Sequence, residues 1–331
     1  MSLDLARHWY RSSYSWLTLL LLPLSGLFGA VIDLRRALFR AGILKTEQVN
    51  VPVMVVGNIS VGGTGKTPMV IWLAEWLQSL GYRPGIVSRG VGGKKHRAPY
   101  CVKADSRVEE VGDEALLLVR ETGCPVVLCL NRVSAVKTLL QQTNCNVVLS
   151  DDGLQHYRLG RDIEIIMIDG MRQLGNQCLL PAGPLRERAA RLSQADLVVV
   201  NGSLAQSHFS MHMTLTEWVA VSDTAQTLPL AAFQGQWVHA IAGIGHPERF
   251  FSALRQAGLK VIPHVFPDHY RYQSKDIEFQ DTLPIVMTQK DAIKCQSFSI
   301  NHAWFARVKV TVSHACQQTL LMTLKKVDKS R

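Results

Sequence analysis

A glycine-rich loop between a strand and a helix constrains this chain more than any other feature. An apolar, β-branched run from Val53 to Val56 stops at a glycine, and an apolar-periodic segment from Met69 to Leu80 begins a few residues later. The loop between them contains Ser60, Val61, Gly62, Gly63, Thr64, Gly65, Lys66 and Thr67. Strand, glycine-rich loop and helix in this order indicate a phosphate-binding loop, or P-loop.

The residue types in this loop suit a nucleoside triphosphate. Its three glycines permit backbone angles closed to other residues, so N–H groups can surround an anion at the positive end of the following helix. We expect Lys66 to contact the β- and γ-phosphates and the Thr67 hydroxyl to ligate Mg²⁺. Ser60 stands where the usual pattern has glycine. The alternative, an ordinary surface loop, is disfavoured by the strand before it and the helix after it.

A fourth apolar strand, predicted near 146–150, ends in two aspartates. Asp151 and Asp152 precede Gly153, and this tripeptide alone is a favourable turn. Downstream of a P-loop, however, a carboxylate at a strand end holds Mg²⁺ directly or through water. We therefore expect these aspartates to lie beside the P-loop.

The length and the repeated strand–helix alternation predict an α/β protein of more than one part. For 331 residues we expect two domains, or one large domain with additions. The predicted fold is a P-loop NTPase-type α/β/α sandwich with a second, smaller α/β domain and an N-terminal membrane-associated helix. The predicted limits are 1–48 for the apolar N-terminal segment, 49–208 for the nucleotide-binding domain, 209–232 for linker strands and 233–331 for the smaller domain.

The N-terminal segment contains a long uncharged run. No charged residue occurs from Trp16 to Ile32, while arginines lie on both sides. A spanning helix would be at the short end of the required length and would contain Pro23, and a secretory signal does not suit a nucleotide-binding domain. A helix or broken helix lying in the membrane interface fits the aromatic and basic flanks best. A buried core helix is the alternative.

The charge and the cysteine content limit which kinds of partner and which cellular compartment we expect. The formal net charge of +10 favours an anionic partner, which composition alone leaves open among nucleic acid, an acidic membrane surface and a phosphorylated substrate. The seven cysteines are scattered and form no CxxC pair, which indicates a reducing compartment and no structural zinc. The sequence does not indicate an oligomeric state.

A phosphoryl acceptor requires a proton acceptor nearby. The candidates are carboxylates and histidines at predicted loop positions: Asp113, Glu114, Asp151, Asp152, His156, Asp268 and His269. Two basic loops either hold phosphate or are solvated, one with Arg89, Lys94 and Lys95 and the other with Arg186, Arg188 and Arg191.

Seven motifs in order resemble the tetraacyldisaccharide 4′-kinase family, the lipid A 4′-kinases of Gram-negative bacteria. They are SVGGTGKTP at 60–68, VGDEA at 111–115, SDDGLQH at 150–156, LPAGPLRE at 180–187, AGIGHPERF at 242–250, FPDH at 266–269 and TQKDAIK at 288–294. The P-loop alone would not be specific, but this series covers nearly the whole chain. Two departures are Val91, where the family pattern leads us to expect an aromatic residue, and Tyr270, where a second histidine is common.

The resemblance implies a reaction and a set of roles. The γ-phosphate of ATP would pass to the 4′-hydroxyl of a tetraacylated glucosamine disaccharide 1-phosphate, giving lipid IVA, with no nucleic acid partner. Two α/β/α domains joined by a two-stranded linker would bind the nucleotide between them. Asp113 and His269 would form a catalytic dyad, and Glu114, Asp151 and Asp152 would serve Mg²⁺. The N-terminal helix would sit on the cytoplasmic face of the inner membrane.

Two other classes of protein remain as alternatives. A P-loop GTPase or ATPase switch acting on a protein partner would carry a guanine-specificity motif, but in the segment 288–291 the lysine is displaced by one position. A membrane-binding module with a vestigial loop is disfavoured by the intact Lys66, Thr67, Asp151 and Asp152.

Overall fold

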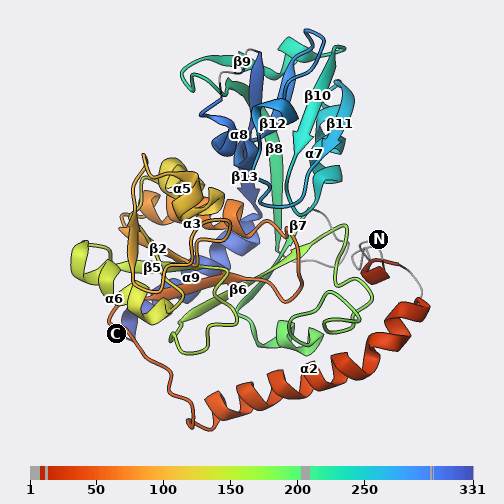
Figure 1. The fold of residues 1–331 in the computed structure, drawn as a ribbon. Coiled ribbons are helices and arrows are strands. Elements are labelled where there is room, and N and C mark those ends of the chain that lie inside the picture. Colours follow the sequence, from red (N-terminus) through yellow and green to blue (C-terminus); the bar gives the residue numbers. More distant parts are fainter. Residues whose placement is uncertain (1–7, 12–13, 203–208, 299, 301, 331) are drawn as a thin grey trace.

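The computed structural model describes residues 8–11, 14–202, 209–298, 300 and 302–330. Thirteen strands of these residues form one mixed sheet that runs through both halves of the protein (Figure 1). The strand order is β11-β10-β12-β13-β8-β7-β6-β1-β5-β2-β4-β3, with β9 paired to β8.

The first half is a parallel sheet centred on β1. Its strands are β1 (Val53–Gly57), β2 (Pro84–Ser88), β3 (Tyr100–Val102), β4 (Val126–Leu128), β5 (Val147–Asp151), β6 (Ile163–Asp169) and β7 (Leu197–Asn201). Strand β1 lies between β5 and β6 and is parallel to both, and only β3 is antiparallel to its neighbour. The carboxyl ends of these parallel strands meet at one edge, where an open α/β sheet binds ligands.

Helices cover both faces of this parallel sheet. They are α3 (Lys66–Ser79), α4 (Val108–Val111), α5 (Asp113–Thr122) and α6 (Arg132–Gln142), with a 3-10 turn, η1 (Ala189–Gln194). Apolar side chains of α3 and α5 pack on one face, and those of α6 pack on the other. The predicted α/β/α sandwich is confirmed.

The second half continues the sheet through two long antiparallel strands. Its elements are β8 (Ser210–Ala220), β9 (Thr227–Pro229), η2 (Leu230–Phe233), β10 (Trp237–Ala242), α7 (Pro247–Gln256), β11 (Lys260–Val265), η3 (Ser274–Asp276), β12 (Ile285–Thr288), α8 (Gln289–Cys295), β13 (Ala303–Val312) and α9 (His314–Lys329). Strands β8 and β13 pair along most of their length, with a register shift between Arg307 and Val308. They connect the two halves (Figure 1).

The C-terminal helix does not pack with the domain to which the predicted limits assign it. We assigned residues 233–331 to the smaller domain, but α9 lies against the core of the first half. Its buried side chains, Cys316, Leu320 and Leu324, repeat every four residues and form one apolar face that joins the cluster around α3. The other domain limits stay predictions.

The N-terminal apolar run forms one helix, α2 (Trp16–Arg40), along the outer side of the first half (Figure 1). The Ser15 hydroxyl caps it by accepting a hydrogen bond from the Thr18 amide at 3.2 Å, and the helix continues through Pro23. By length and composition it is able to cross a membrane, since its most apolar stretch of 18 residues has a mean hydropathy of 2.0. Only 22% of its most apolar stretch is buried, whereas a core helix would be mostly buried.

Candidate active site

The P-loop has a conformation that requires glycine at its end. Gly65 precedes α3 with a φ of 93°, and a Cβ atom there would lie 2.4 Å from Nδ2 of Asn201. Asn201 ends β7, and its Nδ2 donates a hydrogen bond to the Thr64 carbonyl oxygen at 3.2 Å. A neighbouring strand thus fixes the loop at the start of α3, where backbone N–H groups are available to an anion.

Lys66 and Asp152 come together as the two motifs predict. The Lys66 Nζ atom lies 3.6 Å from Oδ1 of Asp152, because β1 and β5 are adjacent and parallel. Arg186 approaches the same carboxylate at 3.4 Å. Burial tends to raise the pKa of Asp152, but Lys66 and Arg186 outweigh it and hold this pKa below its usual value. The acidic strand end therefore faces the P-loop lysine.

Asp151 is a buried carboxylate with an unsatisfied oxygen. The residue is 1% exposed, and its Oδ1 atom has no hydrogen-bond partner among the described residues. Burial first, and then the charges of Glu114 and Asp152, raise its pKa to about 7. A divalent cation would supply the missing partner and favour the ionised form, so the donor set fits Mg²⁺. Within the described part of the chain, no three acidic, His or Cys side chains converge on one point as metal ligands.

Asp113 and His269 form a close pair across the two halves. Nδ1 of His269 lies 3.0 Å from Oδ1 and 3.2 Å from Oδ2 of Asp113. Asp113 begins α5 and is 2% exposed, whereas His269 lies in the loop after β11 with a φ of 59°. The hydrogen bond that His269 donates to the Asp113 carboxylate raises the pKa of His269 against the opposing effect of burial. At Asp113, burial tends to raise the pKa, but His269 and Lys290 outweigh it and hold this pKa below its usual value.

Two lysines of α8 complete the charge balance around this pair. Lys290 Nζ lies 3.1 Å from Glu114, 3.0 Å from Asp268 and 3.9 Å from Asp113. Lys294, one turn later, lies 3.8 Å from Asp113. The sequence motifs alone assign no role to either lysine. The two lysines are four residues apart on a helix that follows a strand end, so both lie on one face of it. This spacing is the sequence feature that could have pointed to them as site residues.

The loop after β2 lies against the same pair. A Cβ atom on Gly92 would meet Nδ1 of His269 at 3.0 Å and Oδ1 of Asp113 at 3.2 Å, so glycine lets the backbone approach. The Arg89 guanidinium lies 3.2 Å from Nε2 of His156. Burial, followed by the charges of nearby arginines, lowers the pKa of His156 to about 3, so this candidate stays neutral.

A second contact joins the halves at the P-loop itself. Arg172 donates a hydrogen bond to the Gly245 carbonyl oxygen at 2.8 Å, and a Cβ on Gly245 would lie 2.6 Å from the Gly63 amide nitrogen. Asp169, at the end of β6, lies 3.1 Å from the Arg249 guanidinium of α7. These contacts cannot be predicted from the sequence motifs, because they join residues far apart in the chain.

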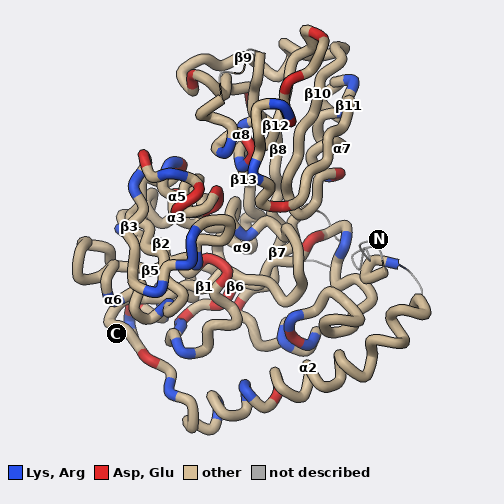
Figure 2. Tube along the Cα trace, in the orientation of Figure 1, with Lys and Arg blue, Asp and Glu red and all other residues tan. Residues whose placement is uncertain are grey.

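The other predicted basic residues differ in their surroundings. Arg188 pairs with Asp33 of α2 at 2.8 Å, and Arg191 pairs with Glu164 and Glu187. Only Arg186 of that loop faces the P-loop side. Lys94 pairs with Glu110 at 3.3 Å on the surface. Figure 2 shows basic and acidic residues dispersed along the whole trace.

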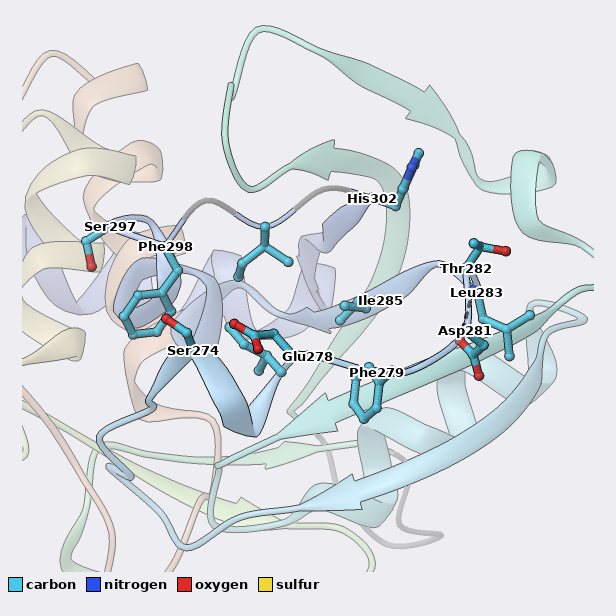
Figure 3. Close-up of a pocket in the computed structure, with 12 residues that line it drawn as sticks. Ser274, Glu278, Phe279, Asp281, Thr282, Leu283, Ile285, Ser297, Phe298 and His302 are labelled. Atoms are coloured by element: carbon cyan, nitrogen blue, oxygen red, sulfur yellow. Dashed lines mark hydrogen bonds between the residues drawn. The ribbon is translucent and has the colours of Figure 1, made fainter.

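A pocket of about 550 Å³ lies elsewhere, in the second half (Figure 3). Phe279, Asp281, Ile285, Phe298 and His302 are among its lining residues. None of the predicted site residues lines it. The P-loop and the dyad, rather than this pocket, therefore define the candidate active site.

Known proteins resemble this chain over nearly its full length. A family model described as "Tetraacyldisaccharide-1-P 4′-kinase" matches residues 17–325. The "Tetraacyldisaccharide 4′-kinase" of Nitrosococcus oceani is 47% identical over 98% of this chain and 95% of its own, and that of Alkalilimnicola ehrlichii is 46% identical over 97% of each chain.

A solved structure agrees with these sequence matches. LpxK from Aquifex aeolicus, whose crystal structure is described as in complex with ATP, is 30% identical. It aligns with a TM-score of 0.77 over 92% of this chain and 98% of its own. With matches of this extent, the chain belongs to the tetraacyldisaccharide 4′-kinase family and is a kinase.

Proposed function

We propose that this kinase transfers the γ-phosphate of ATP to the 4′-hydroxyl of a tetraacylated glucosamine disaccharide 1-phosphate, giving lipid IVA in lipid A biosynthesis. The names of its near full-length relatives support the substrate class. The related structure with ATP supports the nucleotide. No observation favours the alternative of a switch acting on a protein partner.

The Asp113–His269 pair carries the proposed chemistry. Asp113, held ionised by its low pKa, accepts a hydrogen bond from the Nδ1–H group of His269. This tautomer leaves Nε2 of His269 as an acceptor for the proton of the attacking hydroxyl. The raised pKa of His269 suits a group that takes up a proton during the reaction.

The P-loop and the acidic strand end have complementary proposed roles. Residues 60–67 surround the phosphates, and Lys66 stabilises the charge that develops on the transferred group. We assign Asp151, together with Thr67, Glu114 and Asp152, to Mg²⁺, which would supply neutralising charge at the phosphate oxygens. The unsatisfied Oδ1 atom of Asp151 supports this assignment.

Helix α2 is the proposed membrane contact on the cytoplasmic face of the inner membrane. Its outward side chains Leu20, Leu24, Leu27 and Val31 are each more than half exposed. An acylated substrate leaves the bilayer at a cost of about 0.8 kcal/mol for each methylene group, so the enzyme must reach the membrane. A helix lying in the interface meets that requirement.

Transfer from labelled ATP tests the proposed reaction directly. The γ-labelled nucleotide and a detergent-dispersed tetraacyldisaccharide 1-phosphate are incubated with the wild type and with Lys66→Ala. Labelled lipid from the wild type alone supports the reaction, the substrate class and the nucleotide site. ATP hydrolysis without labelled lipid, or a strong preference for GTP, contradicts the proposed acceptor.

A further inference from the structure

Lys290 lies where the two halves meet, beside the proposed dyad. It belongs to α8 of the second half, which lies next to the start of α5 in the first half (Figure 1). Its side chain is 15% exposed, and its Nζ atom lies 3.0 Å from Asp268, 3.1 Å from Glu114 and 3.9 Å from Asp113. The ammonium group therefore joins a carboxylate beside His269 to the two carboxylates that begin α5.

His269 has a backbone conformation that other contacts must hold. Its φ is 59°, in the left-handed region that residues other than glycine rarely adopt. Its amide donates a hydrogen bond to Oδ1 of Asp268 at 3.1 Å, and the same oxygen accepts a hydrogen bond from Nζ of Lys290 at 3.0 Å. Lys290 thus reaches the backbone of His269 through one shared carboxylate oxygen. A strained conformation persists only where the surrounding contacts fix it.

The place of Lys290 on α8 goes against the local preference of a helix. The first turn of a helix favours acidic residues, and Asp291 is there with its amide capped by the Thr288 side chain. A cation at the second position, with most of its side chain buried, costs stability unless carboxylates pair with it. The carboxylates that pair with Lys290 all lie on segments of the proposed active site. We therefore look for the role of this lysine in the site rather than in the helix.

The proposed reaction depends on where the His269 ring points. The hydrogen bond to Asp113 at 3.0 Å holds one ring nitrogen, Nδ1. Lys290, through Asp268, holds the backbone from which the ring projects. The two attachments together fix the direction of Nε2, which must lie within hydrogen-bond distance of the attacking hydroxyl to take its proton.

We propose that Lys290 is a positioning residue for phosphoryl transfer, which fixes the loop 266–270 against the start of α5 and so aims His269 at the acceptor hydroxyl. This inference rests on the proposed dyad of Asp113 and His269. It assigns to Lys290 a role that acts through another residue, since its contacts are with carboxylates on both sides of the junction.

Gln289, the residue before Lys290, offers a matched control. Its Nε2 atom donates a hydrogen bond to Oε1 of Glu121 at 2.7 Å, so it also joins α8 to α5. Glu121 lies about two turns of α5 after Asp113, away from the loop 266–270. Gln289→Ala therefore removes a contact between the halves without touching this loop. Lys290→Met removes the charge of the lysine and keeps most of its aliphatic stem.

The test combines steady-state kinetics at saturating Mg²⁺ with hydrogen exchange measured by mass spectrometry on the full-length protein in detergent. Lys290→Met should lower kcat by about 10- to 10²-fold, the range for a reacting group displaced by up to about 1 Å, with a KM for ATP close to that of the wild type. The amides of the loop 266–270 should exchange faster. Gln289→Ala should change neither quantity. Equal effects of the two variants, or a lowered Tm with wild-type kcat in Lys290→Met, overturn the proposal.

A second variant guards against misfolding of Lys290→Met. The Asp268 side chain is 39% exposed, so Asp268→Ala opens no core cavity, and it leaves Lys290 paired with Glu114. This variant should also speed up exchange in the loop 266–270 and lower kcat. In the double variant kcat should fall little further, because Lys290 acts through Asp268. Fully multiplicative losses overturn the proposal.

His269→Ala separates failure of this positioning role from failure of the proposed function. If His269→Ala loses turnover while Lys290→Met keeps it, the positioning role is wrong and the dyad stands. If Lys290→Met loses turnover while His269→Ala keeps it, the effect does not pass through His269, and both are wrong. Hydrogen exchange is measured without substrate, so unchanged exchange of the loop 266–270 in Lys290→Met overturns the proposal whichever acceptor the enzyme phosphorylates.

Discussion

The imidazole of His269 lies 3.0 Å from the Asp113 carboxylate, although the two residues are 156 positions apart in the chain. Asp113 starts a helix of the first half, and His269 follows a strand of the second half. Since the long strands β8 and β13 join the halves, the pair exists only when the halves are correctly placed. The proposed dyad is thus sensitive to their relative position.

Removing the Asp113 carboxylate should lower the pKa of His269. In Asp113→Asn the hydrogen bond to an ionised acceptor is lost, and that bond is the main cause of the raised pKa. NMR titration of the His269 ring should therefore show a lower midpoint than in the wild type. The stabilisation of the wild type by this pair is present below about pH 6.5, the usual value, and is lost as the pH rises through the raised pKa. An unchanged midpoint would contradict the pairing.

Loss of either dyad residue should reduce kcat, and the effects of the two losses on kcat should not be additive. We expect Asp113→Ala and His269→Ala each to lower kcat by about 10²- to 10⁴-fold with a small effect on KM. The double variant should be little worse than either single variant, because the two groups act as a unit. Fully multiplicative losses in steady-state kinetics would contradict a dyad.

Lys66→Ala should abolish most transfer and leave the fold intact. Lys66 is partly exposed and sits at the first residue of α3, so its removal opens no core cavity. The loss of charge at the transferred phosphate should cost about 10²-fold or more in kcat. Circular dichroism serves as the folding control, and near-normal turnover would contradict the P-loop assignment.

Asp151→Asn tests the magnesium site through stability as well as activity. A carboxyl whose pKa is raised from 3.8 to about 7 costs stability as the pH rises through that range, since the folded state holds the proton longer. Without metal, Asp151→Asn should therefore melt at a higher temperature than the wild type at pH 8 and show little difference at pH 4.

Added Mg²⁺ should raise the Tm of the wild type at pH 8 but not that of Asp151→Asn, because the variant lacks the buried charge. A similar Mg²⁺-dependent increase in both proteins would place the ion elsewhere.

Charged residues on the outer face of α2 should release the protein from membranes. Leu20 and Leu27 are each 65% exposed, so Leu20→Asp together with Leu27→Asp should leave the packed side of the helix intact. Each aspartate costs about 2.5–3.5 kcal/mol if its side chain enters the centre of the bilayer. Sedimentation with vesicles measures the loss, and Met322→Asp, on the exposed side of α9, is the matched control. Unchanged sedimentation would contradict the membrane contact.

Local patterns in the sequence determined the elements that bind phosphate. The glycines before Lys66 and the acidic end of β5 follow from short-range backbone and charge rules, and the order of motifs identified the family. The parallel α/β/α core follows as well, because apolar runs alternate with amphipathic helices.

Only the tertiary structure decided which distant residues meet. Lys290 reaches Glu114 and Asp268 at once, Gly245 lies against Gly63, and α9 returns to the first half instead of completing the second. No local rule predicts these contacts. Each depends on the order of strands in the sheet and on how segments far apart in the sequence pack against one another.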